Sequence, residues 1–190
     1  MASVFMSFIH EEENVAKHVH DFLREIFNGQ IDTFRSSDRS AIYAGEEWMD
    51  RIFEELKSAK VLISLLSPVS VNRPWINFEA GAAWMKDTKV IPVCFGGLTI
   101  ENLPKPYSSL QAVELKTLQS AYYLVSSIAH HLGLPEPKRP FLGPDGGVSL
   151  ACQNPEEQKE LRRPYKMLLW NVEVDMDEDV RQIQKEDMHS

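Results

Sequence analysis

The sequence predicts an α/β protein in which a mainly parallel sheet is covered by helices on both faces. Short apolar runs, typical of strands buried on both sides, alternate with stretches that carry apolar residues at helical spacing. Glycines and polar loops separate the two kinds of segment. Helices of about 10–16 residues between short buried strands indicate βαβ units, whose right-handed crossovers place helices on both faces.

The strands are expected at five apolar runs, of which the third is the clearest: Ser3–Ile9, Ile31–Phe34, Lys60–Leu66, Lys89–Phe95 and Gln111–Leu115. Pro92 has no N–H to donate to a sheet, so the fourth strand should be irregular or have an open side.

The helices are expected at four amphipathic or apolar stretches: Glu11–Phe27, Trp48–Leu56, the segment that starts at Pro74, and Leu118–Leu132. The first carries an apolar stripe at helical spacing, has three glutamates in its first turn and stops at Gly29. Proline is a natural residue for the first turn of the third.

The chain divides by composition into a domain of residues 1–135 and an extension of residues 136–190. The extension starts with a linker rich in proline and glycine. Glu156–Trp170 could be helical, although Pro164 interrupts the run, and Asp175–Asp179 should be acidic and exposed. Most of the net charge lies here, because residues 141–190 hold 11 acidic and 6 basic side chains.

Composition excludes several classes of function. The net charge of −8 argues against a general nucleic-acid binder, which needs a basic face. The two cysteines, Cys94 and Cys152, have no ligand spacing around them, and no metal site is expected. The N-terminus lacks a basic leader, and no stretch reaches the ~18 apolar residues of a membrane span. We therefore expect a cytoplasmic protein that binds no membrane.

Two segments at the predicted carboxyl edge of the sheet, where ligands bind in such folds, could carry chemistry. Trp75 and Glu79 lie four positions apart, which on a helix puts the indole and a partly desolvated carboxylate on one face. The alternative is a core tryptophan and a solvated glutamate. The loop of residues 35–48 offers arginines and serines that suit an anionic ligand or a partner surface, or it is an ordinary surface loop.

Taken together, these segments resemble a Toll/interleukin-1 receptor (TIR) domain of the stand-alone bacterial type. Val4–Phe8 resembles the first strand of that family, and Ala59–Pro68 its third strand with a Ser-Pro exit. Pro74–Gly81 matches the Trp-x-x-x-Glu element, and Lys89–Val93 the fourth strand. Residues 36–48 resemble the second-strand loop, and the likeness covers about residues 1–135.

The resemblance implies a flavodoxin-like fold with a five-stranded sheet, and an enzyme that cleaves the nicotinamide–ribose bond of NAD. NAD is then a substrate and no cofactor is expected. Glu79 carries over as the catalytic residue, and Trp75 as the residue that lines the nicotinamide side. The other implied substrate-binding residues belong to the first strand and the second-strand loop: Ser7, Phe8, Arg35, Arg39, Gly45 and Trp48.

One carboxylate suffices for this chemistry, because nicotinamide in NAD is already a cationic leaving group and only the developing oxocarbenium ion needs stabilisation. Water would give ADP-ribose, and an internal nucleophile a cyclic product. The resemblance further implies activation by self-association, anti-phage defence and a downstream effector that responds to the product. The alternatives are a non-enzymatic TIR adaptor and, less favoured, an enzyme of the nucleoside deoxyribosyltransferase type.

Overall fold

The computed structural model describes residues 2–36, 48–140 and 155–187. Five strands form one sheet in the order β2-β1-β3-β4-β5, and every neighbouring pair is parallel. They are β1 (Ala2–Ser7), β2 (Ile31–Arg35), β3 (Val61–Leu66), β4 (Lys89–Cys94) and β5 (Val113–Glu114). The predicted α/β fold with a five-stranded parallel sheet is confirmed.

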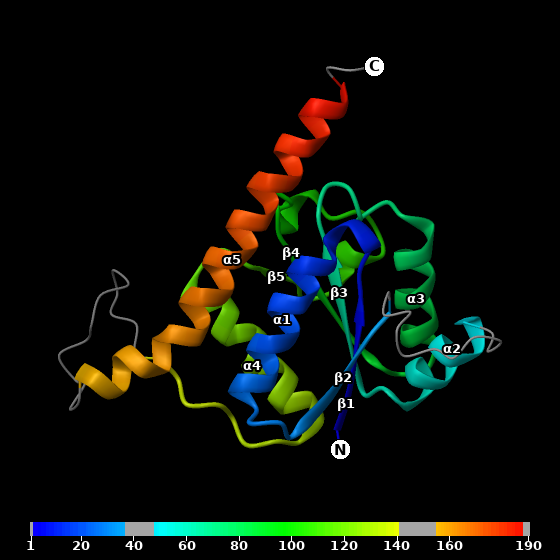
Figure 1. The fold of residues 1–190 in the computed structure, drawn as a ribbon. Helices are drawn as coiled ribbons and strands as arrows, with labels where there is room; N and C mark the ends of the chain where they lie inside the picture. Colours follow the sequence, from blue (N-terminus) through cyan, green and yellow to red (C-terminus); the bar gives the residue numbers. More distant parts are fainter. Residues whose placement is uncertain (1, 37–47, 141–154, 188–190) are drawn as a thin grey trace.

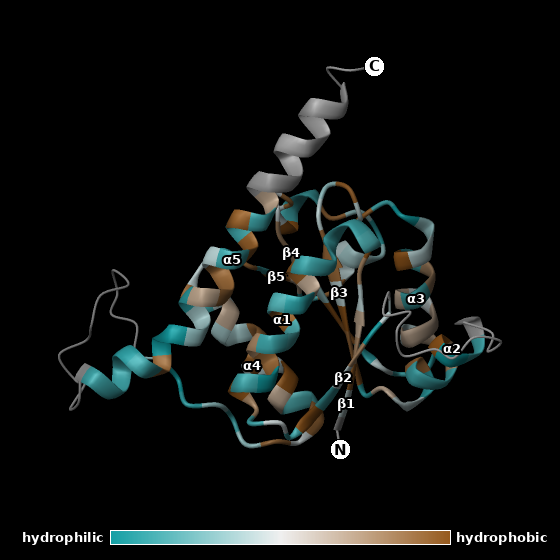
Figure 2. Cartoon of the chain, in the orientation of Figure 1, coloured by the Kyte–Doolittle hydropathy of each residue, from teal (hydrophilic) through white to brown (hydrophobic). Residues whose placement is uncertain are grey.

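Helices cover both faces of the sheet (Figure 1). On one side lie α1 (Glu13–Ile26), α4 (Leu118–Leu132) and α5 (Pro155–Asp187). On the other lie α2 (Trp48–Ser58) and α3 (Pro74–Met85). Figure 2 shows apolar strands between helices that are mixed in hydropathy, as expected for a sheet buried on both sides. Within the residues described, no helix combines the length and apolar character that a membrane span requires.

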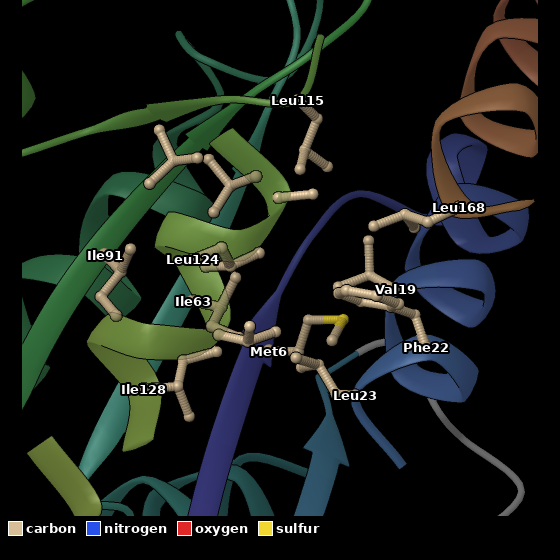
Figure 3. Close-up of a cluster of buried hydrophobic side chains, with 14 of the residues drawn as sticks. Met6, Val19, Phe22, Leu23, Ile63, Ile91, Leu115, Leu124, Ile128 and Leu168 are labelled. Carbon is tan, nitrogen blue, oxygen red and sulfur yellow. The ribbon is translucent and has the colours of Figure 1, made fainter. Parts of the chain in front are cut away.

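Alternation along the strands decides what each face receives. Val4 and Met6 of β1, and Phe8 just after the strand, enter the core under α1, α4 and α5. Phe5 points to the opposite face, and Ser7 shares its direction because it lies two residues further along. Figure 3 shows the larger core, in which residues from β1, β3 and β4 meet side chains of α1, α4 and α5.

The edge of the sheet at β4 and β5 shows why Pro92 is tolerated. β4 pairs with β3 over its whole length but with β5 only at Val93 and Cys94. The backbone N–H groups of Lys89 and Phe95 donate to the β3 side, so that residue 92, an odd number of positions away, faces the β5 side. The predicted open side is confirmed, and no ladder hydrogen bond to β3 is lost.

The first helix starts later than predicted. His10–Glu12 form a single 3-10 turn, η1, before α1 begins at Glu13. Of the three glutamates predicted for the first turn of the helix, Glu12 is buried. Its carboxylate accepts a hydrogen bond from Ser67 Oγ, so it joins the β1–α1 connection to the β3–α3 connection.

The helix of the C-terminal extension is longer than predicted and runs through Pro164. Tyr165, Leu168 and Val172 are buried in the larger core, where the Tyr165 ring meets Phe22 edge-on at 5.1 Å. Burial of this apolar stripe stabilises a helix that proline alone would interrupt. The helix therefore packs on residues 1–135 through these buried side chains. The proline- and glycine-rich composition of the preceding linker did not predict this packing.

Polar contacts add to the attachment of α5. His18 Nε2 lies 2.9 Å from Asp175 Oδ2, and Arg163 pairs with Glu25 at 3.4 Å. The expectation that Asp175 is exposed is wrong, because its side chain faces α1 and keeps only 18% of its accessible surface. The division of the chain into a domain of residues 1–135 and an extension of residues 136–190 remains a prediction. Helix α5 of the extension nevertheless shares one core with residues 1–135.

Candidate functional site

The candidate site lies where the strand order reverses, between β1 and β3. In an open parallel sheet the loops after these two strands diverge, which leaves a crevice at the carboxyl edge. β1 ends at Ser7 and β3 at Leu66, and the chain after β3 leads directly into α3. Helix α3 carries Trp75 and Glu79, so both predicted residues are brought to this part of the sheet.

Glu79 is a fully buried carboxylate, with no exposed surface. Its Oε2 accepts a short hydrogen bond from Ser7 Oγ of β1, which reaches across from the sheet to the helix. Its Oε1 has no hydrogen-bond partner of good geometry in the described part of the chain. The prediction that Glu79 is desolvated is confirmed, and the alternative of a solvated helix residue is wrong.

Burial controls the charge of Glu79. Desolvation raises its pKa from 4.5 to about 7, because the ionised form loses its hydration inside the protein. Hydrogen bonds from Ser7, Trp75 and Ser36 stabilise the carboxylate and oppose this rise. A buried acid with a pKa near neutrality at the carboxyl edge of a parallel sheet is typical of a functional group rather than of a structural one.

Trp75 forms the outer wall of the carboxylate site. The ring is half-buried and stacks on Phe78 with centroids 5.4 Å apart, and Phe53 of α2 meets Phe78 edge-on at 6.1 Å. The indole N–H acts on the Glu79 carboxylate, which confirms the mutual reach that the four-residue spacing predicts. Phe78 remains 45% exposed, so an aromatic surface adjoins the buried acid.

The second buried glutamate, Glu12, has a different role in the geometry. Ser67 Oγ donates to Glu12 and accepts the backbone N–H groups of Val69 and Ser70 at 3.0 and 3.2 Å. Ser70 Oγ in turn accepts the N–H of Ser67 at 2.8 Å. Glu12 therefore closes a network that shapes the loop before α3, and it holds the two loops of the crevice together.

Ser7 is the one predicted first-strand residue that the structure brings to Glu79. Phe8 is buried in the larger core, on the opposite face of the sheet. Arg35 pairs with Met6, whose side chain also enters that core, and its charge helps to lower the pKa of His20 on α1. Alternation thus directs Phe8 and Arg35 away from Glu79, and their roles toward a substrate stay predictions.

Three predicted residues cannot be placed in the site. Arg39 and Gly45 lie outside the described residues. Trp48 begins α2, but its side chain also lies outside what the structure describes.

The structure adds three hydroxyl groups to the site that the sequence did not single out as its members. Ser36 follows β2, Ser64 lies on β3 directly opposite Ser7, and Tyr107 comes from the β4–β5 connection. All three are buried. For Ser36 the sequence offered a signal, since it lies in the loop whose serines suit an anionic ligand, and for Ser64 the signal was a polar residue within an apolar strand.

Comparisons with known proteins identify the family and support the fold. A model of the family described as "TIR domain" matches residues 4–123. No curated protein matches the chain significantly. Among solved structures, a metazoan TIR-STING receptor from C. gigas, in complex with 2′,3′-cGAMP, is similar with a TM-score of 0.50 and 20% identity. The match covers 70% of this chain and 39% of that one, so the chain spans well under half of the receptor's length.

A second solved structure, the TIR domains of the activated Roq1 resistosome, is 12% identical with a TM-score of 0.41. That match covers 98% of this chain and 99% of the other, but such a score supports no conclusion. The receptor, at its low identity, shows the fold alone. The family model covers well over half of the chain, and its limits enclose Ser7, Trp75 and Glu79. The chain therefore belongs to the TIR domain family.

Proposed function

We propose that this protein cleaves the nicotinamide–ribose bond of NAD, with Glu79 as the catalytic residue and Trp75 beside the nicotinamide. The observation that carries the proposal is the fully buried Glu79 carboxylate, which receives a hydrogen bond from Ser7 at the end of β1 and whose pKa burial raises to about 7. A buried acid poised near neutrality is typical of functional sites.

The reaction needs negative charge beside the ribose and little else. Nicotinamide leaves NAD as a neutral molecule, taking the electron pair of the glycosidic bond, and positive charge develops on the ribose. The Glu79 carboxylate stabilises this oxocarbenium ion, and does so strongly because its surroundings exclude water. The pyridinium charge of the bound substrate favours ionisation of Glu79, so a pKa of about 7 in the free protein leaves the group available.

The closed state of the site supports activation by self-association. Glu79 has no exposed surface, so a dinucleotide reaches it only after the surroundings of the crevice rearrange. We infer that contacts between TIR domains supply this opening, as the family resemblance implies. Activity should then rise more steeply than in proportion to protein concentration.

The product is ADP-ribose if water attacks the ribose, or a cyclic or related nucleotide if an internal nucleophile does. By the resemblance to stand-alone bacterial members, we extend the proposal to anti-phage defence in the cytoplasm. There the loss of NAD itself, or a downstream effector that responds to the product, would carry the signal.

The test is NAD consumption by the purified full chain over a range of protein concentrations, with products identified by mass. Glu79→Gln should lower turnover by at least about 100-fold, because the nearly isosteric amide keeps the shape of the site and loses its charge. Undiminished turnover by Glu79→Gln would overturn the catalytic assignment.

Glu12→Gln is the matched control. Glu12 is also buried and also accepts a serine hydroxyl, but its donor is Ser67 in the loop after β3, whereas the donor to Glu79 is Ser7 of β1. An amide oxygen can still accept the Ser67 hydroxyl, so turnover should stay within about threefold of the wild type. Equal losses in the two variants would assign the effect of Glu79 to folding.

A non-enzymatic interaction module is the second candidate, and one observation favours it. Helix α3 exposes Phe78, Trp84 and Met85, the last at 88% of its accessible surface. Exposed apolar side chains on one helix are typical of protein interfaces. No NAD turnover at any concentration, together with concentration-dependent association that Met85→Ser weakens, would favour the module over the enzyme.

A further inference from the structure

The connection between β4 and β5 packs against α3, next to the catalytic carboxylate. Residues 95–112, all of them described, contain two single 3-10 turns, η3 (Ile100–Asn102) and η4 (Tyr107–Ser109), and no α-helix. Apolar residues of this connection, Tyr107 among them, share a small core with Ile76 and Ala80 of α3. Tyr107 is one of the largest fully buried side chains, with 1% exposure.

The phenol of Tyr107 joins the helix to the sheet. Its hydroxyl donates to the backbone carbonyl of Ile76 at 3.2 Å, in the first turn of α3. The Ser64 hydroxyl of β3 lies close enough to the phenol to oppose the rise in its pKa that burial causes. Ser64 lies directly opposite Ser7, the residue that donates to Glu79. Two neighbouring serines of the sheet therefore lie next to groups that contact or belong to α3. Ser64 lies near Tyr107, which donates to α3, and Ser7 donates to Glu79 of α3.

Tyr107 and Glu79 lie close enough for the charge of Glu79 to affect the pKa of Tyr107. Burial raises the pKa of Tyr107 to about 12, the Ser64 hydroxyl opposes the rise, and the charge of Glu79 adds to it. Ile76 precedes Glu79 by three positions, or nearly one helical turn. A shift of the first turn of α3 would accordingly move the carboxylate relative to Ser7.

We propose that Tyr107 is a positioning residue for Glu79, because its buried hydroxyl, which lies near Ser64 of the sheet, holds the first turn of α3 through the carbonyl of Ile76. The catalytic part of this inference rests on the proposed function, whereas the structural coupling of Tyr107 to Glu79 does not. Transition states tolerate displacement of a charged group less than substrate binding does, so the effect should fall on kcat.

The kinetic test compares Tyr107→Phe with Tyr122→Phe. Both changes delete one buried tyrosine hydroxyl, but that of Tyr122 donates to Glu136 at 2.7 Å, on the other face of the sheet. Tyr107→Phe should lower kcat for NAD cleavage about 5- to 20-fold with KM within twofold, and Tyr122→Phe should leave both within twofold. A kcat loss no larger than that of Tyr122→Phe overturns the proposal.

Ser64→Ala provides a second variant in case Tyr107→Phe folds poorly. It removes the sheet end of the same link and keeps the phenol ring in place. We expect a kcat loss of about 3- to 10-fold, again with little change in KM. Unchanged kcat in Ser64→Ala contradicts the role assigned to the link.

A measurement without NAD separates this proposal from the proposed function. In a double-mutant cycle of denaturant unfolding at pH 8, Tyr107→Phe and Glu79→Gln should couple by at least threefold in the unfolding equilibrium constant. Tyr122→Phe and Glu79→Gln should be additive within about 1.5-fold. Additive effects of the Tyr107 and Glu79 changes overturn the positioning role whatever the NAD assay shows. Strong coupling in a protein that never cleaves NAD upholds the position of Tyr107 and refutes the enzyme.

Discussion

The two faces of the sheet differ in kind. Under α1, α4 and α5 one continuous apolar core runs from β1 to β5 (Figure 3). Under α2 and α3 the apolar residues form two separate clusters, one around Phe5 and Leu62 and the other around Leu66 and Tyr107. Ser7, Ser64 and Glu79 are buried on this same side, where alternation along the strands directs both serines.

This difference separates stability from chemistry. A buried polar group costs free energy unless its partners are present, so a face that contains several is less stable than an apolar one of the same size. Proteins accept such a cost mainly at functional sites. The continuous face therefore contributes most to stability, and the interrupted face contains the buried carboxylate on which the proposed function rests.

The largest expected effect comes from a pair of adjacent leucines on β3. Leu65 points into the continuous core and Leu66 into the small cluster on the other face, and neither has exposed surface. Leu65→Ala should lower the free energy of unfolding by about 3–5 kcal/mol and Leu66→Ala by about 2–3 kcal/mol, because a cavity in the larger core collapses less.

Denaturant unfolding measures both leucine variants at one pH, with the slope of the transition checked for two-state behaviour. Equal losses would show that the two faces contribute alike and would break the comparison. A larger loss for Leu66→Ala would reverse it.

The next effect concerns Glu79 and pH. Its folded-state pKa of about 7 lies above the ordinary 4.5, so the folded protein is stabilised fully below pH 4.5 and loses this contribution as pH rises to about 7. The Glu79→Gln variant has no carboxyl group to ionise at this position, so it does not lose this stability as pH rises. The variant should be more stable than the wild type by about 1–3 kcal/mol at pH 8 and equal to it near pH 4.

Unfolding of both proteins between pH 4 and pH 8 tests this expectation. Glu12→Gln again serves as the control, since its carboxylate belongs to a loop network on the β3 exit. A Glu79→Gln variant that is less stable at pH 8 would mean that the carboxylate is structural, and the interrupted face would lose its functional meaning.

Much of this contrast could be predicted from the sequence, since local pattern determines it. Apolar runs and helical stripes predicted all five strands and the helices that cover them. Burial of a strand on two faces requires a continuous apolar run, and burial of one helix face requires apolar residues at helical spacing. The Trp-x-x-x-Glu spacing predicted that Trp75 and Glu79 share a helix face, and the carboxylate is indeed desolvated. These features depend on residues within one or two turns of each other.

The parts that could not be predicted depend on distant segments. The local pattern placed Glu12 in a first helical turn and said nothing of its burial, because its partner Ser67 lies 55 positions away. Tyr107 and Ser64 meet only after β4 and β5 are in place. The length of α5 was underestimated because Pro164 weakens the local pattern, whereas Tyr165 and Leu168 gain stability from a core that the local pattern does not contain.

The smallest expected effect tests whether α5 belongs to the continuous face. Gly96 and Gly97 follow β4, and both have positive φ, at 61° and 88°, so alanine is strained at either position. Only at Gly96 would a Cβ collide with a side chain, that of Met176 on α5. Gly96→Ala should therefore cost up to about 1 kcal/mol more than Gly97→Ala, because it adds to the backbone strain a displacement of the Met176 side chain from its packed position.

The additional loss of stability of Gly96→Ala over Gly97→Ala should depend on Met176. This dependence makes the test specific to α5. In a Met176→Ala background the flexible side chain is gone, so Gly96→Ala and Gly97→Ala should have similar costs in denaturant unfolding. An excess that persists without Met176 would assign the effect to the turn alone. No excess in the wild-type background would mean that α5 leaves the domain readily, and the continuous face would then end at α1 and α4.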